Sequence, residues 1–325
     1  MRFVPDYNID IIRDEDFPNA IKNIEQQLDI YRNSGFFDTF DGEKIYYEYF
    51  LAQNSKASVV IVHGLSEFTR KFYEVTYYFL NQGYNVFLYD QRCHGLSSRL
   101  ADRIELIHVD SFKDYAADLS IFIDKIVIPT EKKPIYIYSH SMGGAVTAMY
   151  LVKNSAKIEK AVLSAPLIEP HVAKVSLPVA RFGIRLGLIL CGKKEKSRTS
   201  GEFNPERARK RSKEPSKNRF LHNLNMRCEN PNYQSTPMTY SWVYNSLIVE
   251  KNFLQRRKVA KINTPILLLC AEKDTVVKTE PQKRFSERCK NCTFVVIKGS
   301  DHSMLTSTHE TITEHLTRVF DFYRT

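Results

Sequence analysis

Ser141 lies where an apolar run passes directly into a helical pattern. Residues 135–138 read IYIY, and residues 139–144 read SHSMGG. Where a serine sits on a tight strand-to-helix turn, the residues two positions away must be small, because strand and helix pass close together. Gly143 meets this requirement, and Ser139, which replaces the glycine usual at the other position, is still small. The segment predicts that Ser141 is an exposed nucleophile.

A serine hydroxyl is a weak nucleophile near neutral pH, so it needs a general base and an acid that orients the base. Such groups gather at the C-terminal ends of parallel strands. The apolar run 266–270 leads to Asp274, and the run 294–297 leads to His302. Serine, acid and histidine follow one another in the chain order expected after a turn of this kind. We therefore predict a triad of Ser141, Asp274 and His302.

Three other side chains lie near these positions. Glu272 is closer to the end of its strand than Asp274, but two further residues allow a side chain to turn inward. Asp301 adjoins the predicted base and is too close along the chain to hold its ring. His140 adjoins Ser141, but neighbours on such a turn point apart, and we interpret it as a structural histidine.

Acyl transfer also needs hydrogen-bond donors for the oxyanion that develops on the substrate. One donor is expected to be the backbone N–H of Met142, directly after the nucleophile, and the other lies in the loop after an early strand. The apolar run 58–62 is followed by HGLSE at residues 63–67. We predict Leu65 N–H as the second donor, with Gly64 letting the backbone come close. The polar segment 90–97 is interpreted as loop-bracing, without a chemical role.

The elements that must position these groups alternate along the chain. After a hairpin around the Asp41-Gly42 turn, apolar runs typical of buried parallel strands occur at 58–62, 85–89, 135–138, 160–163, 266–270 and 294–297. Helical patterns accompany them at 69–81, 111–126, 142–153 and 309–323. This alternation predicts an α/β fold, a mostly parallel central sheet flanked by helices.

Two segments stand outside this alternation. Residues 17–33 have a helical pattern, so we expect residues 1–35 to form a helical N-terminal extension. Residues 167–249 show helical or irregular patterns but no convincing core strand, which is typical of an inserted cap or lid. The predicted core is then formed by residues 36–166 and 250–325.

Positive charge is concentrated in the predicted cap. The 325-residue chain has a formal net charge of +10, and residues 193–220 contain eleven Lys/Arg against four Asp/Glu. The apolar residues 175–190 directly precede them. Apolar surface beside cations fits an anionic membrane or a lipid-like substrate, the alternative being a solvated loop. Only Phe203 and Phe220 lie among the basic residues, so we expect no nucleic-acid partner.

We expect neither export nor a membrane span. The N-terminus, MRFVPDYNID, lacks the apolar centre of a secretory signal, and no run of about 18 apolar residues occurs. The six cysteines are expected to be reduced, and the single C-x-x-C, Cys289 to Cys292, to be two loop cysteines. We predict a cytoplasmic protein, at most peripheral on the inner face of the cell membrane, without metal or organic cofactor. The sequence specifies no oligomeric state.

Several motifs together resemble the bacterial lysophospholipase and monoglyceride lipase group of the α/β hydrolases. They are HGLSE at 63–67, DQRCHGLSS at 90–98, YSHSMGGA at 138–145 and IKGSDHSML at 297–305. The cap segment 236–247, TPMTYSWVYNSL, is also similar to that of the inner-membrane-associated lysophospholipases. The resemblance covers nearly all of the chain after about residue 35.

This resemblance implies the α/β-hydrolase fold with an inserted helical cap. It implies Ser141, Asp274 and His302 as the triad, Leu65 and Met142 as oxyanion donors, and a serine esterase that hydrolyses the acyl ester of a lysophospholipid through an acyl-enzyme. A monoacylglycerol lipase, or a general carboxylesterase or thioesterase, is the alternative enzyme. A catalytically inactive lipid-binding protein is the alternative outside enzymes. The cap is unusually basic, and head-group preference depends on it.

Overall fold

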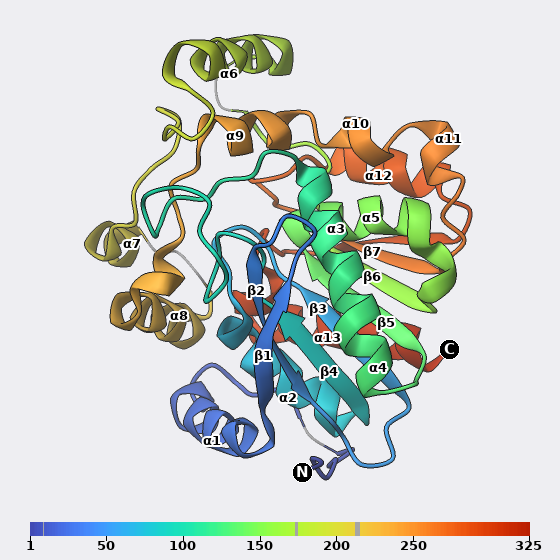
Figure 1. Cartoon of the computed structure of the whole chain (residues 1–325). Helices are drawn as coiled ribbons and strands as arrows, with labels where there is room; N and C mark the ends of the chain where they lie inside the picture. The colour runs from blue at the N-terminus through green and yellow to red at the C-terminus, as the bar shows by residue number, and fades with distance from the viewer. Residues whose placement is uncertain (9, 173–174, 212–214) are drawn as a thin grey trace.

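Strands β3 to β8 form the parallel part of a single sheet. The computed structural model describes residues 1–8, 10–172, 175–211 and 215–325. Its eight strands follow the order β1-β2-β4-β3-β5-β6-β7-β8 (Figure 1). Only the pairs β1–β2 and β2–β4 are antiparallel. The strands are Asn33–Asp38 (β1), Lys44–Phe50 (β2), Ala57–Val62 (β3), Tyr84–Tyr89 (β4), Ile135–His140 (β5), Lys160–Ser164 (β6), Ile266–Ala271 (β7) and Cys292–Ile297 (β8).

Helices cover both faces of this sheet, so β3, β4 and β7 are buried at every residue. Along β3, Val60 and Val62 face one buried cluster and Val59 and Ile61 face the other, as the alternation of a strand requires. The first cluster includes α3 (Phe112–Phe122), α5 (Met142–Asn154) and α12 (Thr279–Arg288); the second includes α1 (Phe17–Tyr31), α2 (Tyr73–Asn81) and α13 (His309–Arg324). The predicted α/β architecture is confirmed.

Short helical turns connect several of these elements. The 3₁₀ turns are η1 (Thr69–Phe72), η3 (Ser155–Lys157), η4 (Pro231–Gln234) and η5 (Met304–Thr306). Helix α3 continues through a π-helical turn, η2 (Ile123–Val127), into α4 (Ile128–Thr130). The helix predicted at 69–81 therefore begins as a 3₁₀ turn, and the one predicted at 111–126 changes its hydrogen-bond pattern near its end.

The N-terminal segment packs onto the core. Helix α1 ends at Tyr31 and β1 begins at Asn33, two residues before the predicted end of the extension. Phe3 and Phe17 are buried in the same cluster as residues of α2 and α13. These contacts fix α1 beside the sheet rather than leaving it apart from it.

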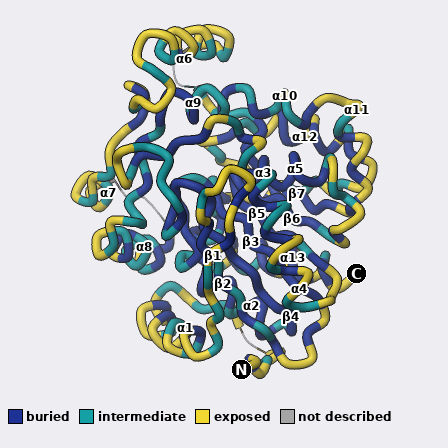
Figure 2. Tube along the Cα trace, in the orientation of Figure 1, coloured by how far each residue is buried: buried dark blue, intermediate teal, exposed yellow. Residues whose placement is uncertain are grey.

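Between β6 and β7 the described residues form seven helical elements. They are α6 (Leu177–Cys191), α7 (Pro205–Arg211), α8 (Lys217–Glu229), η4, α9 (Tyr240–Leu247), α10 (Glu250–Phe253) and α11 (Arg256–Val259). Within the described part of 167–249 only isolated bridges occur, and no strand joins the sheet. Figure 1 shows α6 and α9 above the sheet and α7 and α8 beside it. Helix α6 is largely exposed (Figure 2).

No helix in the described part of the chain is long and apolar enough to cross a bilayer. All six cysteines lie among the described residues, and each is a free thiol. Cys289 is buried at the end of α12 and Cys292 begins β8.

Candidate active site

The turn between β5 and α5 holds Ser141 in a rarely adopted backbone conformation, with φ 51° and ψ −115°. A side chain at Gly143 would place its Cβ 2.0 Å from the Val62 carbonyl oxygen, so only glycine lets α5 start this close to β3. Ser139 is buried, and its hydroxyl donates to the Val162 carbonyl at 2.9 Å. That bond satisfies the hydroxyl, which explains why a serine is accommodated in place of a glycine.

His302 lies between the two other predicted triad residues. Its Nε2 is 2.9 Å from Ser141 Oγ, and its Nδ1 is 2.8 Å from Asp274 Oδ2. Since a carboxylate only accepts, Nδ1 carries the proton and Nε2 is left to accept from the serine hydroxyl. Asp274 is held in turn by the N–H groups of Val276 and Val277, which donate to its Oδ1 at 2.8 and 2.9 Å.

The surroundings of His302 keep its imidazole neutral. Burial lowers the pKa of His302 and outweighs the hydrogen bond to Asp274, which raises it. Burial raises the pKa of Asp274, but the hydrogen bond from His302 opposes it, and the net pKa of this carboxyl is lowered. Near neutral pH the site therefore holds an ionised carboxylate beside an unprotonated base.

The residues weighed against this triad lie elsewhere. Glu272 is exposed and accepts the backbone N–H of Gly299 at 2.8 Å. Asp301 is exposed to solvent. His140 points to Glu67 and to the backbone of His302. None of the three is hydrogen-bonded to Ser141 or to the His302 ring among the described contacts.

Leu65 and Met142 both line the cavity at Ser141. In the described residues neither of their backbone N–H groups has a protein acceptor, so both are free to receive a substrate oxygen. Gly64 makes the close approach possible, because a Cβ there would lie 3.1 Å from Ser141 Cβ and 2.8 Å from Glu67 Oε2. The role of the two N–H groups as oxyanion donors stays a prediction.

The loop that carries Leu65 is braced from the neighbouring segment. Gln91 donates its backbone N–H to His63 Nε2 at 2.9 Å and its side-chain amide to the His63 carbonyl at 2.5 Å. Burial lowers the pKa of His63 to about 4, so its ring is neutral. Asp90 accepts the backbone N–H groups of Thr69 and Leu96 at 2.7 and 2.8 Å. The polar residues after β4 hold loops, as the sequence suggested.

A cavity of about 1030 Å³ opens from Ser141 toward the cap. Its lining is mainly apolar and comes from the segment after β6, from α6 and from α9: Leu167, Val172, Val175, Val179, Ile184, Trp242 and Val243. A cavity of this size with a mainly apolar lining is typical of a small-molecule binding site.

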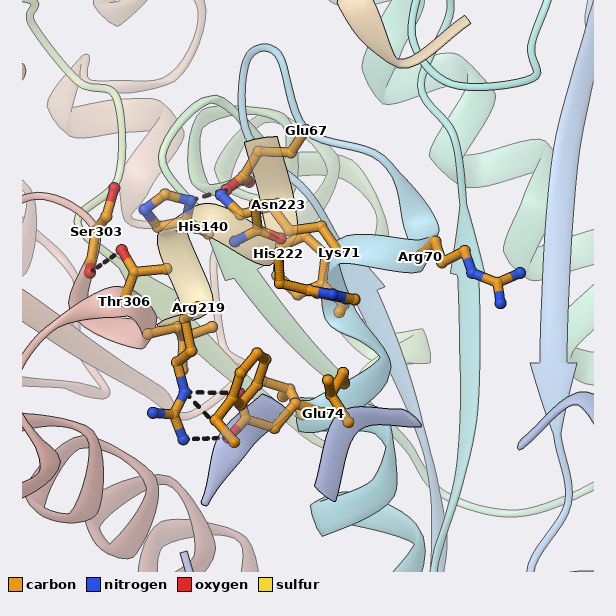
Figure 3. Close-up of a pocket in the computed structure, with 15 residues that line it drawn as sticks. Glu67, Arg70, Lys71, Glu74, His140, Arg219, His222, Asn223, Ser303 and Thr306 are labelled. Carbon is orange, nitrogen blue, oxygen red and sulfur yellow. Dashed lines mark hydrogen bonds and ion pairs between the residues drawn. The ribbon is translucent and has the colours of Figure 1, made fainter. Parts of the chain in front are cut away.

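Behind His140 lies a much smaller cavity of about 40 Å³, lined by α1, α2 and α8 (Figure 3). Arg219 borders it but belongs to a buried ion pair, donating to both oxygens of Glu74. Its guanidinium also lies over the Phe17 ring, 4.7 Å from the centroid. One cation of the basic segment 193–220 is thus buried in the interior. The charged residues around it in the sequence did not predict this burial.

Sequence reasoning also missed Glu67. Its carboxylate accepts the Gly64 N–H at 2.5 Å and the Lys71 ammonium at 2.6 Å, and it faces His140. The only available signal was a glutamate that ends the HGLSE motif next to a predicted oxyanion donor.

The sequence of this chain is similar to those of known proteins. A family model described as serine aminopeptidase, S33, matches residues 53–309. Lysophospholipase L2 of Escherichia coli (strain K12) is 27% identical over 311 residues, covering 90% of this chain and 87% of that protein. A probable lysophospholipase L2 of Haemophilus influenzae is 28% identical over 255 residues, 76% of this chain and 77% of the other.

Solved structures show the same fold at lower identity. A soluble variant of monoglyceride lipase from Saccharomyces cerevisiae, in complex with a substrate analogue, superposes with a TM-score of 0.70 and 17% identity, over 89% of this chain and 93% of that one. A highly thermostable carboxyl esterase from Bacillus coagulans gives a TM-score of 0.73 and 16% identity, over 90% and 98% of the two chains.

Proposed function

Because the chain belongs to the serine hydrolase family described as serine aminopeptidase, S33, and has the α/β-hydrolase fold, we propose that it hydrolyses the acyl ester of a single-chain lipid through an acyl-enzyme on Ser141. The observation that carries the proposal is the hydrogen-bonded line Ser141–His302–Asp274 at the inner end of an apolar cavity of about 1030 Å³. The three residues carry out the reaction, and the cavity binds the acyl chain of the substrate.

In the proposed reaction Ser141 Oγ attacks the ester carbonyl carbon while His302 Nε2 takes the hydroxyl proton. The carbonyl π electrons move to oxygen, and the N–H groups of Leu65 and Met142 stabilise the resulting oxyanion. Collapse of this intermediate breaks the bond to the alcohol, which leaves with the proton from His302. Water, deprotonated by His302, then attacks the acyl-enzyme carbonyl; the bond to Ser141 Oγ breaks, His302 returns the proton to Oγ, and the fatty acid is released. Asp274 holds the imidazole in the required tautomer throughout.

Two relatives with long coverage carry the name lysophospholipase L2, and others are named monoglyceride lipase. We therefore propose a lysophospholipid as the substrate, with a monoacylglycerol as the second candidate. A panel of lysophosphatidylcholine, lysophosphatidylethanolamine, monoacylglycerol and short aryl esters tests this choice. Preference for a long-chain lysophospholipid supports it, and turnover confined to short aryl esters contradicts it.

We assign residues 36–166 and 250–325 to a catalytic core, 1–35 to an extension, and the described residues of 167–249 to a cap.

We also propose that α6 of the cap lies on the inner face of an anionic membrane. Phe182, Leu186, Ile189 and Leu190 are exposed at helical spacing, while Ile184 of the same helix is buried against α9. Exposed cations lie within α6 at Arg185 and shortly after its end at Lys194. An apolar helix face bordered by cations favours such an interface.

A further inference from the structure

His140 lies between two groups that can only accept hydrogen bonds. Its Nδ1 is 3.1 Å from Glu67 Oε2, and its Nε2 is 3.2 Å from the backbone carbonyl oxygen of His302. The side chain is almost fully buried. A neutral imidazole has one donor and one acceptor nitrogen, so it satisfies one of these contacts at most, whereas an imidazolium donates to both.

The partner of His140 is an ionised carboxylate. Besides His140, Glu67 accepts the Lys71 ammonium at 2.6 Å and the Gly64 backbone N–H at 2.5 Å. Burial raises the pKa of Glu67, but Lys71 and His140 together hold it well below its usual range. A buried carboxylate with this many donors stays charged, and it supplies the counter-charge that a buried imidazolium requires.

From this geometry we propose that His140 donates from both ring nitrogens, to Glu67 and to the His302 carbonyl, and that the Glu67–His140 pair positions the catalytic machinery. The pair joins the two halves of the site. Glu67 holds the loop that carries Leu65 by accepting the Gly64 N–H, and His140 holds the segment that carries the catalytic base by contacting the backbone carbonyl of His302. Figure 3 shows the Glu67–His140 contact from the side of the small cavity. The inference rests on the proposed role of His302 as the base.

A fixed cation at this place has a second effect. The rings of His140 and His302 are 5.1 Å apart, centroid to centroid. A neighbouring positive charge disfavours protonation of His302, and so keeps the base free at lower pH. Burial and the positive charge of His140 both lower the pKa of His302, whereas the hydrogen bond to Asp274 raises it.

The neighbouring buried histidines add no charge to this pair. His315 is buried, bonded to the Tyr138 hydroxyl at 2.9 Å, and burial lowers its pKa to about 3. His63 is neutral for the same reason, with a pKa of about 4. Facing His140 and His302 there remain two carboxylates, Glu67 and Asp274, and the ammonium of Lys71, which is bonded to Glu67. Asp274 is the carboxylate bonded to His302, and His140 is the histidine whose ring contacts the His302 ring.

Two neutral variants separate position from charge. In His140→Asn the side-chain nitrogen replaces Nδ1, and in His140→Gln it replaces Nε2, so each keeps a different contact while both lose the charge. We expect both to move the acid limb of kcat/KM to higher pH, by on the order of 1 pH unit for a charge at this distance. Their plateau rates fall to different extents, by roughly ten-fold or more. His222→Asn, which removes a histidine paired with Glu25, is the matched control and leaves the acid limb in place.

Nitrogen-15 NMR of histidine-labelled enzyme tests the protonation state without turnover. We expect His140, assigned by its disappearance in His140→Asn, to carry protons on both ring nitrogens at pH 7, and to lose one in Glu67→Gln. A bare nitrogen on His140 in the wild-type enzyme, or an acid limb unmoved in both His140 variants, overturns the proposal. Failure of the proposed function is seen separately, as hydrolysis that persists in Ser141→Ala.

Discussion

At the scale of single residues, the strained turn at Ser141 sets the reactivity of the site. Its positive φ lifts Oγ out of the line of β5 and toward His302, and the close packing of α5 against β3 through Gly143 maintains that conformation. Such strain persists only where the surrounding structure over-determines it. The nucleophile and the glycine two residues later therefore form one structural unit.

We expect Ser141→Ala to lower kcat by on the order of 10⁶, as in comparable triads, because no other described hydroxyl lies at His302 Nε2. Ester hydrolysis and fluorophosphonate labelling measure the loss. Ser139→Gly is the matched control: it removes one buried hydrogen bond, so unfolding should become easier by about 1 kcal/mol while activity persists. Wild-type-like turnover in Ser141→Ala would contradict the assignment of the nucleophile.

Asp274→Asn should lower kcat by about 10⁴, because an amide no longer fixes the tautomer of His302.

In the wild-type enzyme the base must be unprotonated, and its pKa lies below the ordinary 6.5. kcat/KM should therefore fall as the pH drops through a value below 6.5 and stay level across neutral pH. A pH–rate profile measures this limb, and a midpoint above 6.5 would contradict the lowered pKa.

At the scale of elements, the strands could be predicted from the sequence, but the polar side-chain contacts between segments could not. Each strand of the parallel part is an apolar run, as in Ile266–Ala271, and strand ends at one edge bring distant residues such as Asp274 and His302 together. Contacts between polar side chains leave no such pattern. Glu67 and His140 are 73 positions apart, and neither sequence environment specifies the other. Periodicity reports burial of a face, whereas pairing depends on the folded topology.

Helix α6 is the element that we expect to bind membranes. Ile189→Glu/Leu190→Glu places two carboxylates where the exposed fractions of the native side chains are both 73%, so folding should be little affected. Co-sedimentation with anionic phosphatidylglycerol vesicles should decrease by at least ten-fold, since both apolar contact and charge attraction are lost. Hydrolysis of a short soluble ester should be unchanged.

Ile30→Glu is the matched control for α6. Ile30 is an equally large apolar residue, 65% exposed, but it lies on α1. Vesicle binding that falls as much in Ile30→Glu as in the α6 variant would show that general surface charge, rather than the α6 face, governs adsorption.

At the scale of the whole molecule, three separate parts of the chain meet at Arg219. This residue of α8 donates to Glu74 of α2 and to the carbonyl oxygen of Ile12 in the N-terminal segment. Asp14 reaches the same helix through the backbone N–H of Asn218 at 3.2 Å. Arg219 therefore links the cap, the N-terminal segment and the core at one of the buried contacts between them.

Breaking this buried ion pair should lower stability more than breaking an exposed ion pair. Arg219→Met leaves Glu74 buried without its cation, and we expect the free energy of unfolding to fall by about 3–5 kcal/mol. Arg219→Met/Glu74→Gln should recover a large part, because the stranded charge is gone. Arg103→Met, which breaks exposed pairs with Glu105 and Glu202, should cost less than about 1 kcal/mol. Denaturant unfolding measures all three variants, and equal losses in Arg219→Met and Arg103→Met would mean that the pair at Arg219 does not hold the cap to the core.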